Sequence, residues 1–123
     1  MAEDTQRRLF TVALIGGRRD RRHHSARSGC HRRCLLPLDE ETLARSGEKT
    51  HWVLIVEEDN LAGGWGAEVA ALLGKRCFYH LDAPIARVAA PDSPVPTAPA
   101  LEKVYLPDVE RITAAVRALL EGG

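Results

Sequence analysis

The chain has 123 residues, 45% of them hydrophobic, and its 17 basic and 17 acidic side chains give a formal net charge of zero. This size and composition suit a single folded domain with one core. No apolar run reaches the roughly 18 residues of a membrane span, and the acidic start at residues 1–4 (MAED) lacks the basic and apolar parts of a signal peptide. We therefore expect a cytoplasmic protein that makes no membrane contact.

The neutral total conceals one basic block. Residues 18–33 contain seven arginines and one aspartate, a local charge of +6, so the rest of the chain must carry −6. An arginine block attracts nucleic acid or anionic lipid. This one has no aromatic residue for base stacking and no amphipathic pattern for a bilayer surface. We interpret it as a loosely electrostatic segment and expect no nucleic-acid partner.

The cysteines are odd in number, and the chain has no export signal, which favours free thiols over disulfides. A zinc site in the basic block is the alternative. However, three residues separate its two cysteines instead of the usual two, and the neighbouring arginines repel a cation. We therefore expect no metal site, although the possible ligands are Cys30, Cys34, His23, His24 and His31.

Two regions of different character begin the chain. Residues 9–15 (LFTVALI) are apolar and β-branched, which predicts a buried strand. Residues 16–33 show no apolar recurrence at helical spacing, so they offer no face that could cover a sheet. We predict a loop, a disordered segment or a poor helix there. The expected organisation is a first strand region at 1–15, a basic insert at 16–33 and the main domain at 34–123.

The middle of the chain predicts a helix, a strand and a second helix. Asp39 can cap a helix over 40–46, which Gly47 can end. Residues 52–56 (WVLIV) are apolar on both faces, which is typical of a central parallel strand covered by helices on both sides. A glycine turn at 63–66 then opens a helix with an apolar stripe formed by Val69, Leu72, Leu73 and Cys77.

The last third predicts a strand, a crossing and a helix. Residues 85–89 form a short strand pattern, and four prolines in 91–99 predict an extended surface crossing. A helix begins near Pro107-Asp108, and its apolar face consists of Val109, Ile112, Val116 and Leu119. Together the elements predict an α/β fold with three layers, α/β/α, around a mostly parallel sheet of four to five strands, in which an edge strand can be antiparallel.

The glycine turn has the context of a phosphate-binding loop, because it follows a strand and opens a helix. However, the third glycine of the dinucleotide fingerprint is replaced by Val69, and no P-loop lysine follows. A tight turn that lets strand and helix pack closely is the simpler interpretation. A freestanding nucleotide- or anion-binding module stays open as an alternative.

Catalytic chemistry has little support in the sequence. The carboxylates Glu57, Glu58 and Asp59 end the central strand, where such groups more often face solvent or cap a turn than act as acid and base. His51 and His80 have no nucleophile beside them in the sequence. We therefore predict no catalytic residue in this chain.

Several short sequence motifs occur in the same order and at the same spacing as in one known protein family. They are PLDEET at 37–42, VEE at 56–58, GAE at 66–68, LDAP at 81–84, RV at 87–88, PDSPVP at 91–96, and LE followed by YLP at 101–107. Over residues 35–120 the chain resembles the C-terminal, transketolase-like domain of the beta subunit of thiamine-diphosphate-dependent 2-oxoacid dehydrogenases of the pyruvate and branched-chain type. Residues 16–33 depart from it, because the family has a helix and a second strand there.

The resemblance implies an interaction domain of an enzyme that decarboxylates a 2-oxoacid and passes the acyl group to lipoamide. In such enzymes the alpha subunit and the amino-terminal beta domain hold thiamine diphosphate and magnesium, so no cofactor is expected here. The implied tasks are pairing of beta subunits, assembly with the alpha subunit, and docking onto the peripheral binding domain of the dihydrolipoyl acyltransferase.

The resemblance also implies where these contacts lie. By position, the docking groups are Asp82 and the terminal carboxylate of Gly123, and a turn-capping role before Pro84 is the alternative for Asp82. The candidates for the subunit interface are Glu57, Glu58 and Trp65.

A non-functional fragment is a further alternative. An arginine-, histidine- and cysteine-rich insert between matching flanks is what a GC-rich gene gives when it is read out of frame. Residues 16–33 are therefore also consistent with a frameshifted or truncated reading frame. Such a domain would lack a helix on one face of its sheet and would expose apolar surface.

Overall fold

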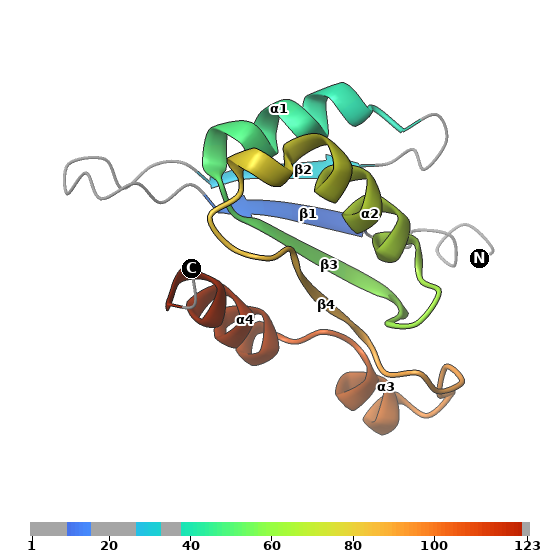
Figure 1. Ribbon diagram of the computed structural model, residues 1–123. Coiled ribbons are helices and arrows are strands. Elements are labelled where there is room, and N and C mark those ends of the chain that lie inside the picture. The colour runs from blue at the N-terminus through green and yellow to red at the C-terminus, as the bar shows by residue number, and fades with distance from the viewer. Residues whose placement is uncertain (1–9, 16–26, 33–37, 122–123) are drawn as a thin grey trace.

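The computed structural model describes residues 38–121 and the backbone of two short segments, 10–15 and 27–32 (Figure 1). None of the helices in these ranges is long and apolar enough to cross a membrane. The predicted α/β class is confirmed. The elements in chain order are β1 (Phe10–Ile15), β2 (Arg27–Arg32), α1 (Glu40–Thr50), β3 (Val53–Asn60), α2 (Trp65–Cys77), the 3₁₀ turn η1 (Phe78–His80), β4 (Ala86–Ala90), α3 (Pro99–Tyr105) and α4 (Val109–Glu121).

The strands form one sheet in the order β2-β1-β3-β4 (Figure 1). Strands β3 and β4 are parallel, whereas β1 is antiparallel to both β2 and β3. The expectation of a mostly parallel sheet is therefore wrong, because two of the three pairings among the described strands are antiparallel and the antiparallel strand β1 lies inside the sheet, not at its edge. Only residues 16–26 connect β1 to β2, and a parallel crossover needs about a dozen residues or more, so this connection favours the antiparallel return.

Strand β3 separates two apolar layers, because its successive side chains point to opposite faces. Val53 and Ile55 pack with the buried residues of α1 and α2, among them Leu43 and Leu73. Leu54 packs on the other side against α4, where Leu119 is buried. The predicted three-layer arrangement is thus present around β3 (Figure 1).

Helix α1 begins where the sequence predicts, because the Asp39 carboxylate accepts a hydrogen bond of 3.0 Å from the Thr42 amide. The predicted end at Gly47 is wrong. Gly47 is buried, and a Cβ placed there would lie 3.3 Å from the Cys77 sulfur, so glycine permits close packing of α1 on α2. The helix runs on to Thr50 and ends at His51, which adopts the left-handed conformation with φ 68°.

Two elements differ from the sequence prediction. Strand β2 lies within the stretch predicted as loop or poor helix, so that prediction is wrong for 27–32; residues 16–26 and 33 lie outside the described residues. Helix α3 was not predicted. It begins at Pro99, the last residue of the predicted extended crossing, and Pro99 occupies its first turn. The predicted last helix is confirmed as α4, and the Asp108 carboxylate accepts from the Arg111 amide at 2.7 Å. The apolar face of α4 is shorter than predicted, because Val109, which was expected to belong to it, is 80% exposed.

Candidate functional site

A buried carboxylate joins the end of β3 to the start of α2. The side chain of Glu57 is 3% exposed, and its Oε2 accepts a hydrogen bond of 2.6 Å from the Gly66 amide. Its Oε1 accepts from Nε of Arg87 at 3.1 Å and forms an ion pair with Nη2 of the same guanidinium. Arg87 Nη1 also donates to the Leu61 carbonyl at 2.9 Å. The charge of Glu57 is therefore satisfied inside the domain.

The glycines of the turn allow this carboxylate to approach the backbone. A Cβ on Gly66 would lie 2.2 Å from Oε1 of Glu57, and a Cβ on Gly64 would lie 2.2 Å from the Asn60 carbonyl oxygen. In a phosphate-binding loop the Gly66 amide would donate its hydrogen bond to the ligand, but here it donates to the Glu57 carboxylate. The geometry favours the tight-turn interpretation over a nucleotide site.

The three candidates for the subunit interface differ in how much of their surface is accessible. Glu57 is only 2% exposed, which argues against its direct contact with another subunit. Glu58, the next residue of β3, is exposed. Trp65 is half-buried, packs against the core under α2, and has an indole Nε1 that is buried without a hydrogen-bond partner in the described part of the chain. Glu58 and Trp65 thus keep surface that a partner can reach.

Asp82 lies on a short segment that is fixed to the end of α1. Its amide donates to the His51 carbonyl at 2.9 Å, and the His51 ring Nδ1 lies 2.5 Å from the His80 carbonyl oxygen, so Nδ1 must carry the proton. The Asp82 side chain is exposed, and within residues 38–121 its carboxylate makes no hydrogen bond or ion pair. These contacts fix the backbone of Asp82 and leave its carboxylate in solvent, and the capping role that was its alternative is not seen within residues 38–121.

Helix α4 passes beside the Asp82 segment. Ala83 packs in the cluster that contains Leu119, and a shallow hollow between the two elements is lined by Ala83, Pro84, Ala115 and Leu119, together with Ala86 and Ala118. The last described residue of α4 is Glu121. The predicted docking group at Gly123 lies outside the described residues.

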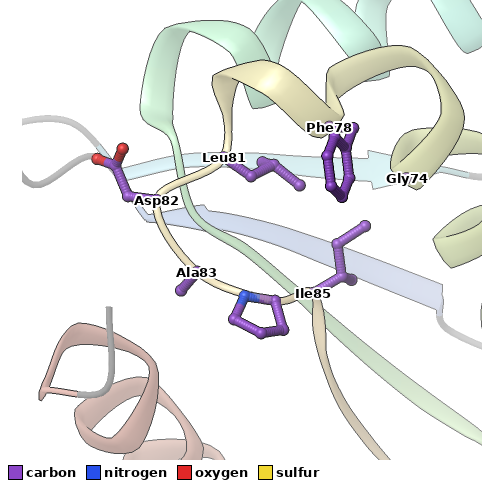
Figure 2. Close-up of a pocket in the computed structure, with 7 residues that line it drawn as sticks. Gly74, Phe78, Leu81, Asp82, Ala83 and Ile85 are labelled. Carbon is purple, nitrogen blue, oxygen red and sulfur yellow. The ribbon is translucent and has the colours of Figure 1, made fainter.

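A larger apolar pocket of about 450 Å³ lies on the other side of the segment, next to the end of α2 (Figure 2). Figure 2 shows Phe78, Leu81 and Ile85 around it, while the Asp82 carboxylate points away from them. The complete lining is Gly74, Phe78, Leu81, Asp82, Ala83, Pro84 and Ile85. The segment thus carries a charge on one side and an apolar surface on the other.

The described residues offer no metal site and no reactive thiol. Residues 38–121 contain no group of three or more histidine, cysteine or acidic side chains that could hold a metal ion, and the side chains of the zinc candidates near Cys30 and Cys34 lie outside the described part. Cys77 is a free, fully buried cysteine whose thiol donates to the Ala44 carbonyl at 3.3 Å. Burial raises the pKa of this thiol above its usual value, so it stays protonated and unreactive at neutral pH.

Comparison with known proteins places the chain in a family. Residues 31–112 match the model of the transketolase C-terminal domain. The chain belongs to this family, and the resemblance inferred from its phrases is confirmed.

The curated relatives show which members of the family the chain is similar to. The chain is 42% identical over 90 residues to the 2-oxoisovalerate dehydrogenase subunit beta of Bacillus subtilis, covering 72% of this chain and 28% of that protein. It is 43% identical over 84 residues to the pyruvate dehydrogenase E1 component subunit beta of Leifsonia xyli, covering 68% and 25%. A beta subunit of an acetoin oxidoreductase of Bacillus subtilis is 42% identical over 88 residues, covering 72% and 26%. The chain therefore spans about a quarter of the length of these relatives.

Sequence reasoning missed the contact between Glu57 and Arg87, which lie 30 residues apart. One signal was present. Glu57 follows Ile55 on one face of β3, and the parallel register places Arg87 opposite Ile55. A single arginine in a short, otherwise apolar strand therefore indicates a carboxylate partner on the neighbouring strand.

Proposed function

We propose that this domain pairs beta subunits and docks the enzyme in a cytoplasmic complex of the 2-oxoacid dehydrogenase type. The whole enzyme would decarboxylate a 2-oxoacid oxidatively and transfer the acyl group to lipoamide. The domain would assemble with an alpha subunit and with another beta subunit. Its docking partner would be the peripheral binding domain of a dihydrolipoyl acyltransferase.

One observation carries the docking role: Asp82 presents a solvated carboxylate from a backbone that is fixed to the end of α1, by the hydrogen bond from its own amide to the His51 carbonyl and by the contact between the His51 ring and the His80 carbonyl. Because the backbone that carries this charge is already ordered, binding costs little backbone entropy, so the carboxylate suits recognition of a basic partner. The nearby course of α4 brings the carboxyl-terminal part of the chain to the same edge of the domain.

The catalytic role is assigned to other parts of the complex. Thiamine diphosphate and magnesium need amides for a diphosphate and oxygen ligands for the ion. Within residues 38–121 the helix-start amide at Gly66 is already used by Glu57, and no three or more histidine, cysteine or acidic side chains form a group that could hold a metal ion. The proposal therefore leaves the binding of the cofactor to other parts of the enzyme and gives this domain the assembly role that the resemblance implies.

Calorimetric titration of the full chain with an isolated peripheral binding domain tests the docking role. We expect Asp82→Asn to weaken binding by about tenfold or more, because it removes a charge that pairs with a basic residue. Glu102→Gln, a change at an exposed carboxylate on α3, is the matched control and should change the affinity by less than about threefold. Equal affinities for wild type and Asp82→Asn would refute docking through this segment.

A further inference from the structure

The charge of Asp82 and the larger apolar pocket belong to the same short stretch of chain. Leu81 lines the pocket, and Asp82 is the next residue. The backbone at Leu81 is extended, with φ −87° and ψ 134°, so the side chains of these two neighbours point to opposite sides. Figure 2 shows Leu81 pointing toward Phe78 and the Asp82 carboxylate pointing away from it. A charged group and an apolar hollow therefore lie one residue apart.

Charge alone is a weak basis for docking at this place. Asp82 is exposed, and ion pairs between exposed groups contribute modestly because water and salt screen them. Charges across an interface raise the rate and the specificity of association more than its affinity. Most of the affinity comes instead from a few large side chains that fill pockets on the partner. A stable contact at Asp82 therefore needs an apolar anchor close by.

The pocket next to Asp82 can receive such an anchor. It has a volume of about 450 Å³, and apart from Asp82 its lining consists of Gly74 and apolar side chains (Figure 2). Phe78 forms one wall and is 66% exposed, so the pocket is open to a group from another molecule. A partner that contacts the Asp82 carboxylate on one side of the segment can therefore reach the pocket on the other side.

We propose that the docking partner uses both features: a basic side chain pairs with the Asp82 carboxylate, and an apolar side chain beside it fills the pocket next to Phe78. The inference rests on the proposed docking role and deepens it, because it states what the partner must carry. Such a partner lies across the segment at 81–84 and contacts both of its sides. Its recognition surface combines an arginine or lysine with an aliphatic or aromatic side chain on one face.

Filling the pocket tests the proposal without changing the charge. Gly74 lines the pocket, and a Cβ placed on it meets no atom within 4 Å, so Gly74→Ala and Gly74→Leu should both fold. Only leucine is large enough to obstruct the pocket. Calorimetric titration of the full chain with an isolated peripheral binding domain should give a dissociation constant within about threefold of wild type for Gly74→Ala and at least about tenfold higher for Gly74→Leu.

Removing one wall of the pocket is an independent test. Phe78→Ser deletes a ring that lines the pocket and should also weaken binding by at least about tenfold. Tyr79→Ser is the matched control, because Tyr79 follows Phe78 in the chain, is 95% exposed and is not among the residues that line the pocket. It should change the dissociation constant by less than about threefold. Thermal unfolding of each variant verifies that it is folded.

Salt separates the apolar contact from the charged one. Between about 0.1 M and about 1 M sodium chloride the Debye length falls from about 10 Å to about 3 Å, which weakens a pair of exposed charges and leaves an apolar contact in place. The weakening caused by Asp82→Asn should therefore shrink at high salt, whereas the weakening caused by Gly74→Leu should persist.

The outcomes distinguish this inference from the docking role on which it rests. If Asp82→Asn weakens binding but neither Gly74→Leu nor Phe78→Ser does, the pocket is not part of the site, and docking through Asp82 stands. A loss in Gly74→Leu that disappears at high salt would also overturn the apolar contact. If Asp82→Asn binds as tightly as wild type, or wild type does not bind the domain, docking at this segment fails and the inference fails with it.

Discussion

The contact between Glu57 and Arg87 should determine whether the domain is stable, and Arg87→Met tests this. The substitution keeps the length of the side chain but leaves the Glu57 carboxylate, which is 3% exposed, without its ion-pair partner. Breaking a buried ion pair by removing one partner costs about 3–5 kcal/mol. Glu57 keeps its hydrogen bond from Gly66, and the arginine itself is 16% exposed, so we expect the lower end of that range, about 3 kcal/mol.

Urea unfolding followed by tryptophan fluorescence measures this effect, because Trp65 directly precedes Gly66 at the start of α2. A loss of about 3 kcal/mol should lower the urea midpoint by about 1–3 M for a chain of this size. Arg45→Met is the matched control. It removes the ion pair with Glu41 on the surface of α1, where both side chains are more than 70% exposed, and should cost less than about 0.5 kcal/mol.

The double variant Glu57→Gln/Arg87→Met separates the unpaired charge from lost packing. Glutamine has no charge to leave unpaired, and its amide oxygen can still accept from the Gly66 amide, so the double variant should be more stable than Arg87→Met alone by about 1–2 kcal/mol. The reasoning is refuted if Arg87→Met costs less than about 1 kcal/mol, or if the double variant is less stable than Arg87→Met.

Three further predictions concern single positions. Gly66→Ala should cost more than about 2 kcal/mol, because its Cβ would lie 2.2 Å from the Glu57 carboxylate, whereas Gly74→Ala should stabilise by up to about 1 kcal/mol; thermal unfolding compares the two. Cys77 should make stability fall as the pH rises above about 9, because its thiol ionises in the unfolded chain while the raised pKa keeps it protonated in the fold; the slope should be smaller in Cys77→Ala. Asp108→Ala should cost about 1 kcal/mol by removing the cap of α4, and an unchanged midpoint would contradict it.

The elements that the sequence predicted well are those whose own residues show a clear local pattern. Strand β3 begins with a run that is apolar on both faces, and α4 combines a proline and an acidic cap with helical periodicity. Helix ends were less accurate. Gly47 resembles a helix stop, but its tight packing on Cys77 keeps it inside α1, and no sequence pattern reports such a tertiary contact.

The missed features depend on residues that are distant in the sequence. Strand β2 has no strand pattern of its own and is defined by its pairing with β1. Helix α3 follows several prolines that indicate an extended chain, although Pro99 is well placed in a first turn. The fixed position of Asp82 depends on His51, and neither residue signals the other. The resemblance pointed to Asp82, but only the fold shows how it is held.

The most direct test of the account is co-expression of this chain with the alpha subunit and the amino-terminal beta-subunit domain of a 2-oxoacid dehydrogenase from the same organism. Size exclusion then shows whether the chain joins a complex, and an assay of 2-oxoacid decarboxylation shows whether that complex is active. The account predicts co-elution and activity that depends on the chain. A chain that elutes alone, with no activity gained, would contradict its role as an assembly domain of such an enzyme.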